Sequence, residues 1–146
     1  MAGGRPAGAS NPVPANALQM TAIPPLWFIR FAVAAVWLYE GLWCKVLGRE
    51  PRQLQVVEAV PHFGPRVGPL LLTTLGLGEI GLAIWVLSGI APGPCALAQT
   101  VLLTALNASG LIWARHIIHD PGGMVVKNFA FLVLAWVAAG LSRGSS

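Results

Sequence analysis

The chain has 146 residues, of which 55% are hydrophobic and only 10% carry a charged side chain. An average soluble domain has about 25% charged residues, so a soluble fold built from this sequence would expose a largely apolar surface. The net charge of +4 does not indicate nucleic-acid binding, because the basic residues lie at the ends of apolar runs and not in a polar stripe. The composition argues against a soluble enzyme or a nucleic-acid-binding protein, and favours a single domain in the lipid bilayer.

The beginning of the chain is rich in Ala, Gly and Pro and contains no apolar run. A secretory signal needs an apolar core of about 7–15 residues, which this stretch lacks. We therefore expect a disordered tail at residues 1–22, a membrane domain at residues 23–142 and a short tail at residues 143–146.

Four apolar segments follow the first tail. A helix needs about 20 residues to cross the roughly 30 Å hydrocarbon layer, and only the fourth segment is slightly shorter than this. Short stretches rich in Pro and Gly separate the segments, and connections this short place sequential helices side by side and antiparallel. The sequence predicts an all-α fold, an integral membrane antiparallel four-helix bundle, with spans at about 26–47, 67–90, 95–118 and 124–141.

The longest connection, between the first and second spans, contains an amphipathic segment at residues 51–60. Pro51 suits the first position of a helix, and Leu54 and Val57 would rest on the membrane surface. The segment predicts a short interfacial helix, with a plain loop as the alternative.

Basic residues are distributed unevenly between the two ends of the predicted bundle. With four spans, both termini lie at one end, together with the second connection, and only Arg5, Arg30 and Arg143 belong to this end. The positive-inside rule therefore places the first and third connections in the cytoplasm and both termini outside. The residues near these two connections are Lys45, Arg49, Arg52, Arg66, Arg115 and Lys127.

Two carboxylates fall inside the predicted spans. An ionised group in hydrocarbon costs roughly 2.5–3.5 kcal/mol on insertion scales, so such a residue needs a partner or a purpose. Glu40 and Lys45 are five residues apart, about 140° round an α-helix, so we predict that they do not pair and that Lys45 snorkels towards the headgroups. Glu79 lies near the middle of the second span among Gly76, Gly78 and Gly81, which favour close helix approach. There it is expected to be paired or protonated, because removal from water disfavours the charged form.

Polar residues of all four spans are expected to meet in the cytoplasmic half of the bundle. Antiparallel threading brings the ends of the first and third spans to the same level as the starts of the second and fourth. Arg115 and His119 are four residues apart and would share a helix face near this level, with Glu79 as the floor of a polar pocket. The predicted ligand-binding or proton-handling residues are Glu40, Lys45, Glu79, Asn107, Arg115, His116, His119, Lys127 and Asn128.

These residues also have structural interpretations. The basic residues and histidines of the third connection and Lys127 would be ordinary interfacial residues, and Glu40 would form a buried ion pair with Arg115 or Lys127. Glu79 would be a neutral acid that fixes the helix register, or a partner of Arg30. Two histidines and one acid are too few for a typical zinc site, so no metal site is predicted. Trp37 and Trp43, which flank Glu40, would pack in the core or line a site for a ring-shaped ligand.

Three short motifs stand out in this sequence: Trp37-Leu38-Tyr39-Glu40-Gly41-Leu42-Trp43-x-Lys45, then Gly78-Glu79, then Pro-Gly-Gly-x-Val-x-Lys-Asn from Pro121 to Asn128. Together they resemble the DoxX-like family of small bacterial membrane proteins, over about residues 27–141. The resemblance implies a four-helix fold in the bacterial inner (cytoplasmic) membrane. Related DoxX and DoxD proteins include subunits of a thiosulfate:quinone oxidoreductase, and others join membrane complexes for redox defence. The residues that match patterned polar positions are Glu40, Lys45, Glu79, Lys127 and Asn128.

Three functional hypotheses follow. The first is a redox-linked membrane subunit that binds a quinone-like lipid and a partner oxidoreductase, with Glu40 and Arg115 or His116 holding the head group and exchanging protons. No motif for haem, flavin or nicotinamide is visible, so no covalent cofactor is expected and quinone is the candidate ligand. The second is a small proton-coupled transporter that uses a membrane-embedded Glu, and the third is a structural membrane anchor without a ligand. A homo-oligomer is one alternative for its assembly.

Overall fold

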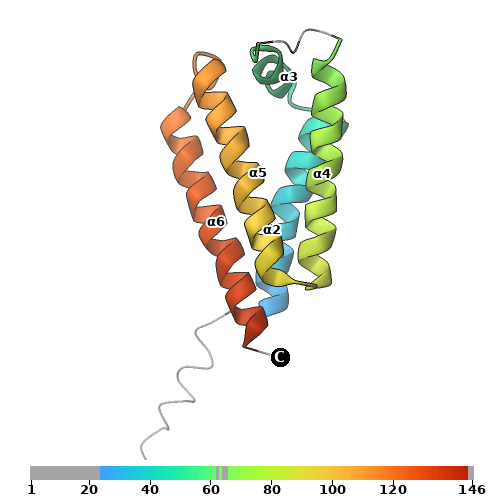
Figure 1. Cartoon of the computed structure of the whole chain (residues 1–146), viewed down its shortest axis with the longest axis vertical. Coiled ribbons are helices and arrows are strands. Elements are labelled where there is room, and N and C mark those ends of the chain that lie inside the picture. The colour runs from blue at the N-terminus through green and yellow to red at the C-terminus, as the bar shows by residue number, and fades with distance from the viewer. Residues whose placement is uncertain (1–23, 62, 64–65, 145–146) are drawn as a thin grey trace, which may run out of the picture.

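The computed structural model describes residues 24–61, 63 and 66–144. All regular secondary structure in these residues is helical (Figure 1). The predicted tail at residues 1–22 lies outside the described residues. The elements are α2 (Leu26–Leu38), the π-helix η1 (Tyr39–Val46), α3 (Pro51–Glu58), α4 (Gly68–Ser88), α5 (Pro92–Trp113) and α6 (Pro121–Arg143). Four spans, counting α2 and η1 as one, are long and apolar enough to cross a membrane, which confirms the predicted all-α four-helix membrane bundle.

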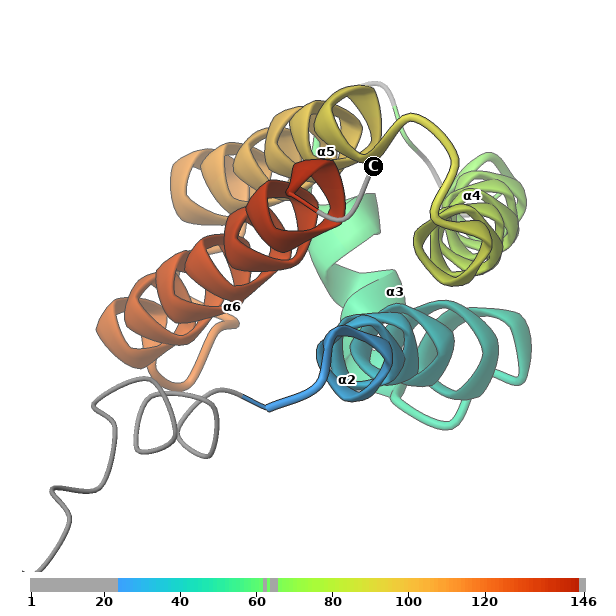
Figure 2. The ribbon, with the colours of Figure 1, turned by 90° about the horizontal axis from the view of Figure 1, so that it is seen from below.

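The bundle consists of two helix pairs. The segment formed by α2 and η1 packs on α4, and α5 packs on α6, while α2 also contacts α6 (Figures 1 and 2). The start of α2 and the end of α6 lie at one end of the bundle, which we call the terminal end. The opposite end carries η1 and the short helix α3, and we call it the α3 end.

Proline and its neighbours set the helix ends. The connection between α4 and α5 uses Gly89 in the left-handed conformation (φ 67°), followed by Pro92 in the first turn of α5. The side chain of Asp120 accepts a hydrogen bond of 2.8 Å from the backbone N–H of Gly123, and so caps α6. Because Pro121 fits the first turn, α6 begins three residues earlier than predicted and has 23 residues. It includes Arg143, which was assigned to a tail, and it is not a short span.

The third span ends earlier than predicted. The backbone leaves the helical conformation at Ala114 (φ −121°, ψ 15°), so α5 stops at Trp113 and not near residue 118. Arg115, His116 and His119 therefore lie in the connection to α6. The prediction that Arg115 and His119 share a helix face is wrong, because no helix carries them.

The predicted helix in the first connection is present as α3. It begins at Pro51, as expected, and ends at Glu58. Leu54 and Glu58 pack on Gly68 at the start of α4, where a Cβ atom would lie 2.9 Å from the Glu58 Cγ atom. The helix thus rests on the end of α4, and its position at the membrane surface stays a prediction.

Small and aliphatic side chains form the packed core. Val33, Ala34 and Trp37 of α2 meet Ala83 of α4 and Ala135 of α6, with Leu82, Val86 and Cys95 completing the cluster. Large apolar side chains cover the outside of all four spans, including Phe31, Leu77, Val101 and Phe129. This arrangement suits lipid as the solvent, because small residues let the helices approach and the apolar exterior faces hydrocarbon.

Candidate functional site

The first motif forms a π-helix and not the α-helix assumed from the sequence. In a π-helix the backbone hydrogen bonds run between residues five apart, so such residues lie almost above one another. The Lys45 Nζ atom lies 3.5 Å from Glu40 Oε2 and donates to the Glu40 carbonyl oxygen at 3.4 Å. The prediction that these two residues do not pair is therefore wrong, because the wider helix turns them to the same side.

Lys45 also reaches the next helix. Its ammonium lies 2.8 Å from Oε2 of Glu79, and the two residues are only 8% and 1% exposed. That carboxylate oxygen makes no hydrogen bond of good angle in the described part of the chain, so the attraction to Lys45 is its main compensation for burial. The prediction that Lys45 snorkels towards the headgroups is wrong, because its side chain is buried. It lies between two carboxylates, one on its own helix and one on α4.

Two glycines allow this buried ion pair to form. A Cβ atom at Gly41 would lie 2.6 Å from the carbonyl oxygen of Gly76, and a Cβ atom at Gly76 would lie 2.7 Å from the carbonyl oxygen of Gly41. The backbones of η1 and α4 therefore touch, as expected for Gly76. Cβ atoms at Gly78 and Gly81 would meet nothing within 4 Å, so the same expectation is wrong for these two residues.

The remaining polar contact of Glu40 leads to α3. Gln53 donates a hydrogen bond of 2.9 Å from Nε2 to Glu40 Oε2. Within the described residues the ion-pair partner of Glu40 is Lys45 and not Arg115 or Lys127. Arg30 does not reach Glu79 either, because its guanidinium donates to Ser142 at the other end of the bundle. Glu40 thus connects the π-helix to the helix that covers it.

The α5–α6 pair contributes amide and aromatic side chains. Asn128 donates to Asn107 at 2.6 Å, which ties α6 to α5. The indole N–H of Trp37 donates to Gln99 Oε1 at 2.8 Å, and the ring meets Phe131 edge to face with centroids 5.6 Å apart. Trp37 is therefore fixed on two sides, with the π-helix directly after it.

A cavity of about 410 Å³ lies between the helix pair formed by α2, η1 and α4 and the pair formed by α5 and α6, which form its two walls. It exists because the helix pairs diverge at the α3 end: no Cα atom of Tyr39–Val46 lies within 8 Å of one in α5 or α6. Trp37 and Phe131 line it at one end, and Gln53 and Val57 of α3 line it at the other. Apolar side chains such as Leu72, Leu75, Leu103 and Leu106 form much of the remaining surface.

The cavity brings together part of the predicted residue set. Glu40, Lys45, Glu79, Asn107, His119 and Asn128 line it. Arg115, His116 and Lys127 are exposed and do not line it, so the predicted convergence is wrong for these three. Arg115 and His116 do not line the cavity because α5 ends before them, at Trp113. Lys127 lies next to Asn128 on α6 and points to another side of the helix.

Sequence reasoning missed the polar residues Gln53 and Gln99. Both side chains are uncharged. Glu40 and Glu79 were noticed because a charge inside the membrane costs free energy, and this signal does not exist for glutamine. Gln99 lies on α5, where it is 2% exposed, and the only sequence signal was an amide inside an apolar run. Gln53 was visible only as a polar position of the amphipathic segment that forms α3.

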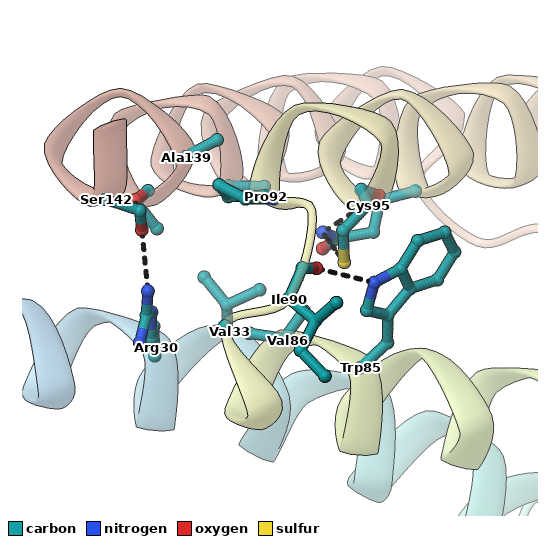
Figure 3. A pocket seen from close by; sticks show the side chains of 13 residues that line it. Arg30, Val33, Trp85, Val86, Ile90, Pro92, Cys95, Ala139 and Ser142 are labelled. Carbon is teal, nitrogen blue, oxygen red and sulfur yellow. Dashed lines mark hydrogen bonds between the residues drawn. The ribbon is translucent and has the colours of Figure 1, made fainter. Parts of the chain in front are cut away.

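A small cavity, of about 20 Å³, lies at the terminal end (Figure 3). Arg30 of α2 donates to the Ser142 hydroxyl of α6 at 2.9 Å, and its guanidinium lies over Gly89. Gln99 lines this cavity too, so the bonded pair of Trp37 and Gln99 separates it from the large one. A water molecule needs at least about 10–15 Å³, so the small cavity has room for one water at most. The helices therefore leave much less space between them at the terminal end than at the α3 end.

The fold and the cavity define a class: this is a multi-pass helical membrane protein with a cavity between its spans, lined by apolar side chains and a few polar ones. Residues 34–136, more than two thirds of the chain, match the family model of the DoxX-like family, and the chain belongs to this family. Comparisons with curated proteins and with solved structures give no match. The matched range contains the π-helix, both carboxylates and Asn128, so the family pattern covers the cavity.

Proposed function

We propose that this DoxX-like protein is a redox-linked membrane subunit that binds the head group of a quinone-like lipid in the cavity at the α3 end. The observation that carries this proposal is the cavity itself: about 410 Å³ next to a lysine buried between Glu40 and Glu79. Small-molecule sites have volumes of about 300–1,000 Å³ and combine an apolar lining with a few polar groups, and this cavity has both properties.

The two walls suit a ring with an oxygen at each side. Gln53 and Lys45 are hydrogen-bond donors on the wall formed by α3 and η1, and the amides of Asn107 and Asn128 lie on the opposite wall. Carbonyl oxygens at opposite sides of a quinone ring would accept from the two walls. Trp37 and Phe131 offer aromatic surfaces for the ring itself. No other described part of the chain combines these groups around a cavity of this size.

Proton exchange falls to Glu40 in this proposal. Its side chain is 41% exposed, whereas Glu79 is held by Lys45 inside the bundle. Reduction of a quinone to a quinol consumes two electrons and two protons. Glu40 would take up a proton from water that enters beside the exposed residues His119 and Arg52 and give it to one ring oxygen, and it would then transfer a second proton from water to the other ring oxygen in the same way. The electrons would come from a partner oxidoreductase docked at the α3 end.

We place the α3 end in the cytoplasm of a bacterium, with the protein in the inner membrane and both termini outside. Exposed basic residues support this orientation, among them Arg49, which lies over the Trp43 ring at 5.6 Å, and Arg52. A reporter enzyme that is active only outside the cytoplasm tests the orientation when fused after Ser146. Activity is expected, and an inactive but expressed fusion contradicts the orientation.

Quinone binding to the purified protein in lipid nanodiscs tests the proposal. Decyl-ubiquinone and a short-chain menaquinone are titrated while tryptophan fluorescence is followed. Glu40→Gln removes a charge-assisted interaction worth about 1.5–3 kcal/mol, so we expect affinity to fall by about tenfold or more. The matched control Lys127→Gln changes an exposed residue on a neighbouring helix and is expected to bind as the unmodified protein does. Equal binding by Glu40→Gln and the unmodified protein, or no binding by either, removes the proposal.

A proton-coupled transporter is the second candidate, and one observation favours it. The large cavity is lined by exposed residues at the α3 end and is separated from the terminal end by the Trp37–Gln99 and Arg30–Ser142 contacts, as one-sided access requires. Substrate-driven proton release from reconstituted vesicles would favour this function over the first. A purely structural anchor predicts instead that Glu40→Gln lowers stability and leaves every ligand affinity unchanged.

A further inference from the structure

The large cavity lies where α6 separates from the segment formed by α2 and η1. At the terminal end α2 and α6 are in contact, through Val33, Ala34 and Ala135 in the core and through Arg30 and Ser142. Towards the α3 end this contact is lost, since no Cα atom of η1 lies within 8 Å of one in α6. The two backbones therefore part along their length, and Val36 of α2 and Phe131 of α6 line the cavity on this side.

Val36 marks the place where this gap meets the outside. It lines the cavity, yet it is 43% exposed, and the residues before and after it on the same helix belong to the lipid-facing surface or the core. On α6 the cavity is lined by Met124, Asn128 and Phe131, while the adjacent Phe129 is 68% exposed. The wall of the cavity and the outer apolar surface thus share an edge at Val36 on one helix and at Phe131 on the other.

This edge lies in the middle of the bilayer. Val36 is halfway along the span Leu26–Val46, and Phe131 is close to the middle of the span Pro121–Arg143. Because the two spans are antiparallel and both are long enough to cross the hydrocarbon, their midpoints lie at about the same depth. The gap therefore opens to acyl chains and not to water.

We propose that the gap between Val36 and Phe131, on the α3 side of the edge-to-face contact between Trp37 and Phe131, is a lipid window, through which a ligand with a long apolar tail enters the cavity head first and keeps its tail in the bilayer. This inference rests on the proposed function and specifies its ligand: a ring or other compact polar head carried on an isoprenoid or alkyl tail. The head then lies between Glu40 and Asn128, one helical turn from the window on each side, and the tail passes between Val36 and Phe131.

The other route into the cavity does not suit such a ligand. At the α3 end the lining includes the charged or polar side chains of Glu50, Arg52 and His119. The helix α3 covers this end and is attached by the hydrogen bond from Gln53 to Glu40. An apolar tail would have to strip water from these groups on its way in, which costs free energy without compensation. The α3 end therefore serves water, protons and polar partners, and the window serves the tailed ligand.

A paired binding experiment tests the window. Val36→Phe narrows it, and Ile84→Phe places the same ring at an exposed position of α4 that lines none of the cavities named above. The probes are decyl-ubiquinone and its tail-less head group, 2,3-dimethoxy-5-methyl-1,4-benzoquinone, mixed with each variant in nanodiscs while tryptophan quenching is followed. Because blocking an entry path acts on association, Val36→Phe is expected to slow binding of the tailed probe by about fivefold or more and that of the head group by less than about twofold. Ile84→Phe should change neither.

Two results of that experiment would overturn the window. One is equal slowing of both probes by Val36→Phe, which would place the added bulk inside the binding site. The other is no slowing of the tailed probe. If neither quinone binds the unmodified protein, the proposed function fails, and a measurement without quinone decides on the window.

That measurement uses a benzophenone label on Leu103→Cys, inside the cavity, in a Cys44→Ala and Cys95→Ala background. Illumination in phosphatidylcholine nanodiscs should attach a phospholipid chain to this label, detected by mass spectrometry, and adding Val36→Phe should remove most of the adduct. A label on Ile84→Cys reports ordinary lipid contact and should react in both backgrounds. A labelled Ile84→Cys protein that reacts beside a labelled Leu103→Cys protein that does not would show that the cavity is closed to lipid.

Discussion

Each end of the bundle holds a basic residue that bonds to a neighbouring helix, and the two ends differ in what surrounds this residue. At the terminal end Arg30 meets the neutral hydroxyl of Ser142, and the helices enclose about 20 Å³. At the α3 end Lys45 meets two carboxylates beside a cavity of about 410 Å³. The same α6 helix passes both ends, so its side chains show where the difference comes from.

Residue size along α6 follows the separation of the helices. Ala135, Ala138, Ala139 and Ser142 are buried in the terminal half and let α2 come close. In the other half the inward residues are the larger Met124, Asn128 and Phe131, and here η1 and α6 are apart. The comparison teaches that the packing of small residues stabilises the terminal end. The α3 end is less tightly packed, and there one network of ion pairs lies beside the cavity.

The largest expected effect is at the centre of that network. Lys45→Met leaves Glu79 buried without its counter-charge, and breaking a buried ion pair from one side costs about 3–5 kcal/mol. We expect the free energy of unfolding to fall by this amount, measured by thermal unfolding in detergent. The double variant Lys45→Met with Glu79→Leu removes both charges and should recover most of the loss. A single variant as stable as the unmodified protein would mean that the ion pair does not hold the α3 end together.

The next effect concerns the contact that brings η1 onto α4. Gly76→Ala places a Cβ atom against the backbone of Gly41, and overpacking of this kind costs about 1–3 kcal/mol. Gly78→Ala, two residues away on the same helix, meets nothing within 4 Å and should be neutral or slightly stabilising. Equal unfolding temperatures for the two variants would contradict the close approach of the two backbones.

A smaller effect is expected at the boundary between the two cavities. Gln99→Leu removes the acceptor of the Trp37 indole N–H, and an unsatisfied buried donor costs about 1–3 kcal/mol, part of which the better apolar packing of Leu offsets. Gln99→Glu keeps an acceptor at the same place and serves as the matched variant. Hydrogen exchange of the indole N–H, followed by NMR, should be faster in Gln99→Leu alone. Unchanged exchange in Gln99→Leu would show that Trp37 is held by packing and not by this bond.

The smallest effect on stability is expected at Asn107. Hydrogen bonds between membrane helices contribute about 0.6 kcal/mol on average, so Asn107→Ala should hardly change the unfolding temperature, although its bond to Asn128 is lost. Quinone affinity should nevertheless fall several-fold, because the amide lines the cavity wall opposite Glu40. Loss of stability with unchanged affinity would assign Asn107 to packing only.

Much of the fold follows from hydropathy and proline positions. The four spans were predicted within a few residues, because lipid requires long apolar helices and because Pro and Gly mark the connections. Pro51 was recognised as a helix start, whereas Pro92 and Pro121 were assigned to turns although each begins a helix. Helix ends without proline or glycine were predicted less well, as at Trp113. Because of this error, Arg115 and His116 were assigned to a helix that ends before them.

The sequence predicted at which end of the bundle the candidate site lies, but not which of its residues form ion pairs. Antiparallel threading alone brings Glu40, Lys45 and Asn128 to one end of the bundle. The contact between Lys45 and both carboxylates depends on the π-helix, which has no simple sequence signal and changes the angle between residues five apart. The cavity depends on the divergence of two helix pairs, which is a property of the whole packing and not of any one segment.

A structure of the protein with a brominated quinone bound would test the central proposal most directly, because bromine on the ring is located by its anomalous scattering. We predict one bromine peak inside the α3-end cavity, between Glu40 and Asn128, with the tail leaving between Val36 and Phe131. A bound quinone whose bromine lies on the outer apolar surface, with the cavity empty of it, would contradict the assignment of the cavity as the binding site.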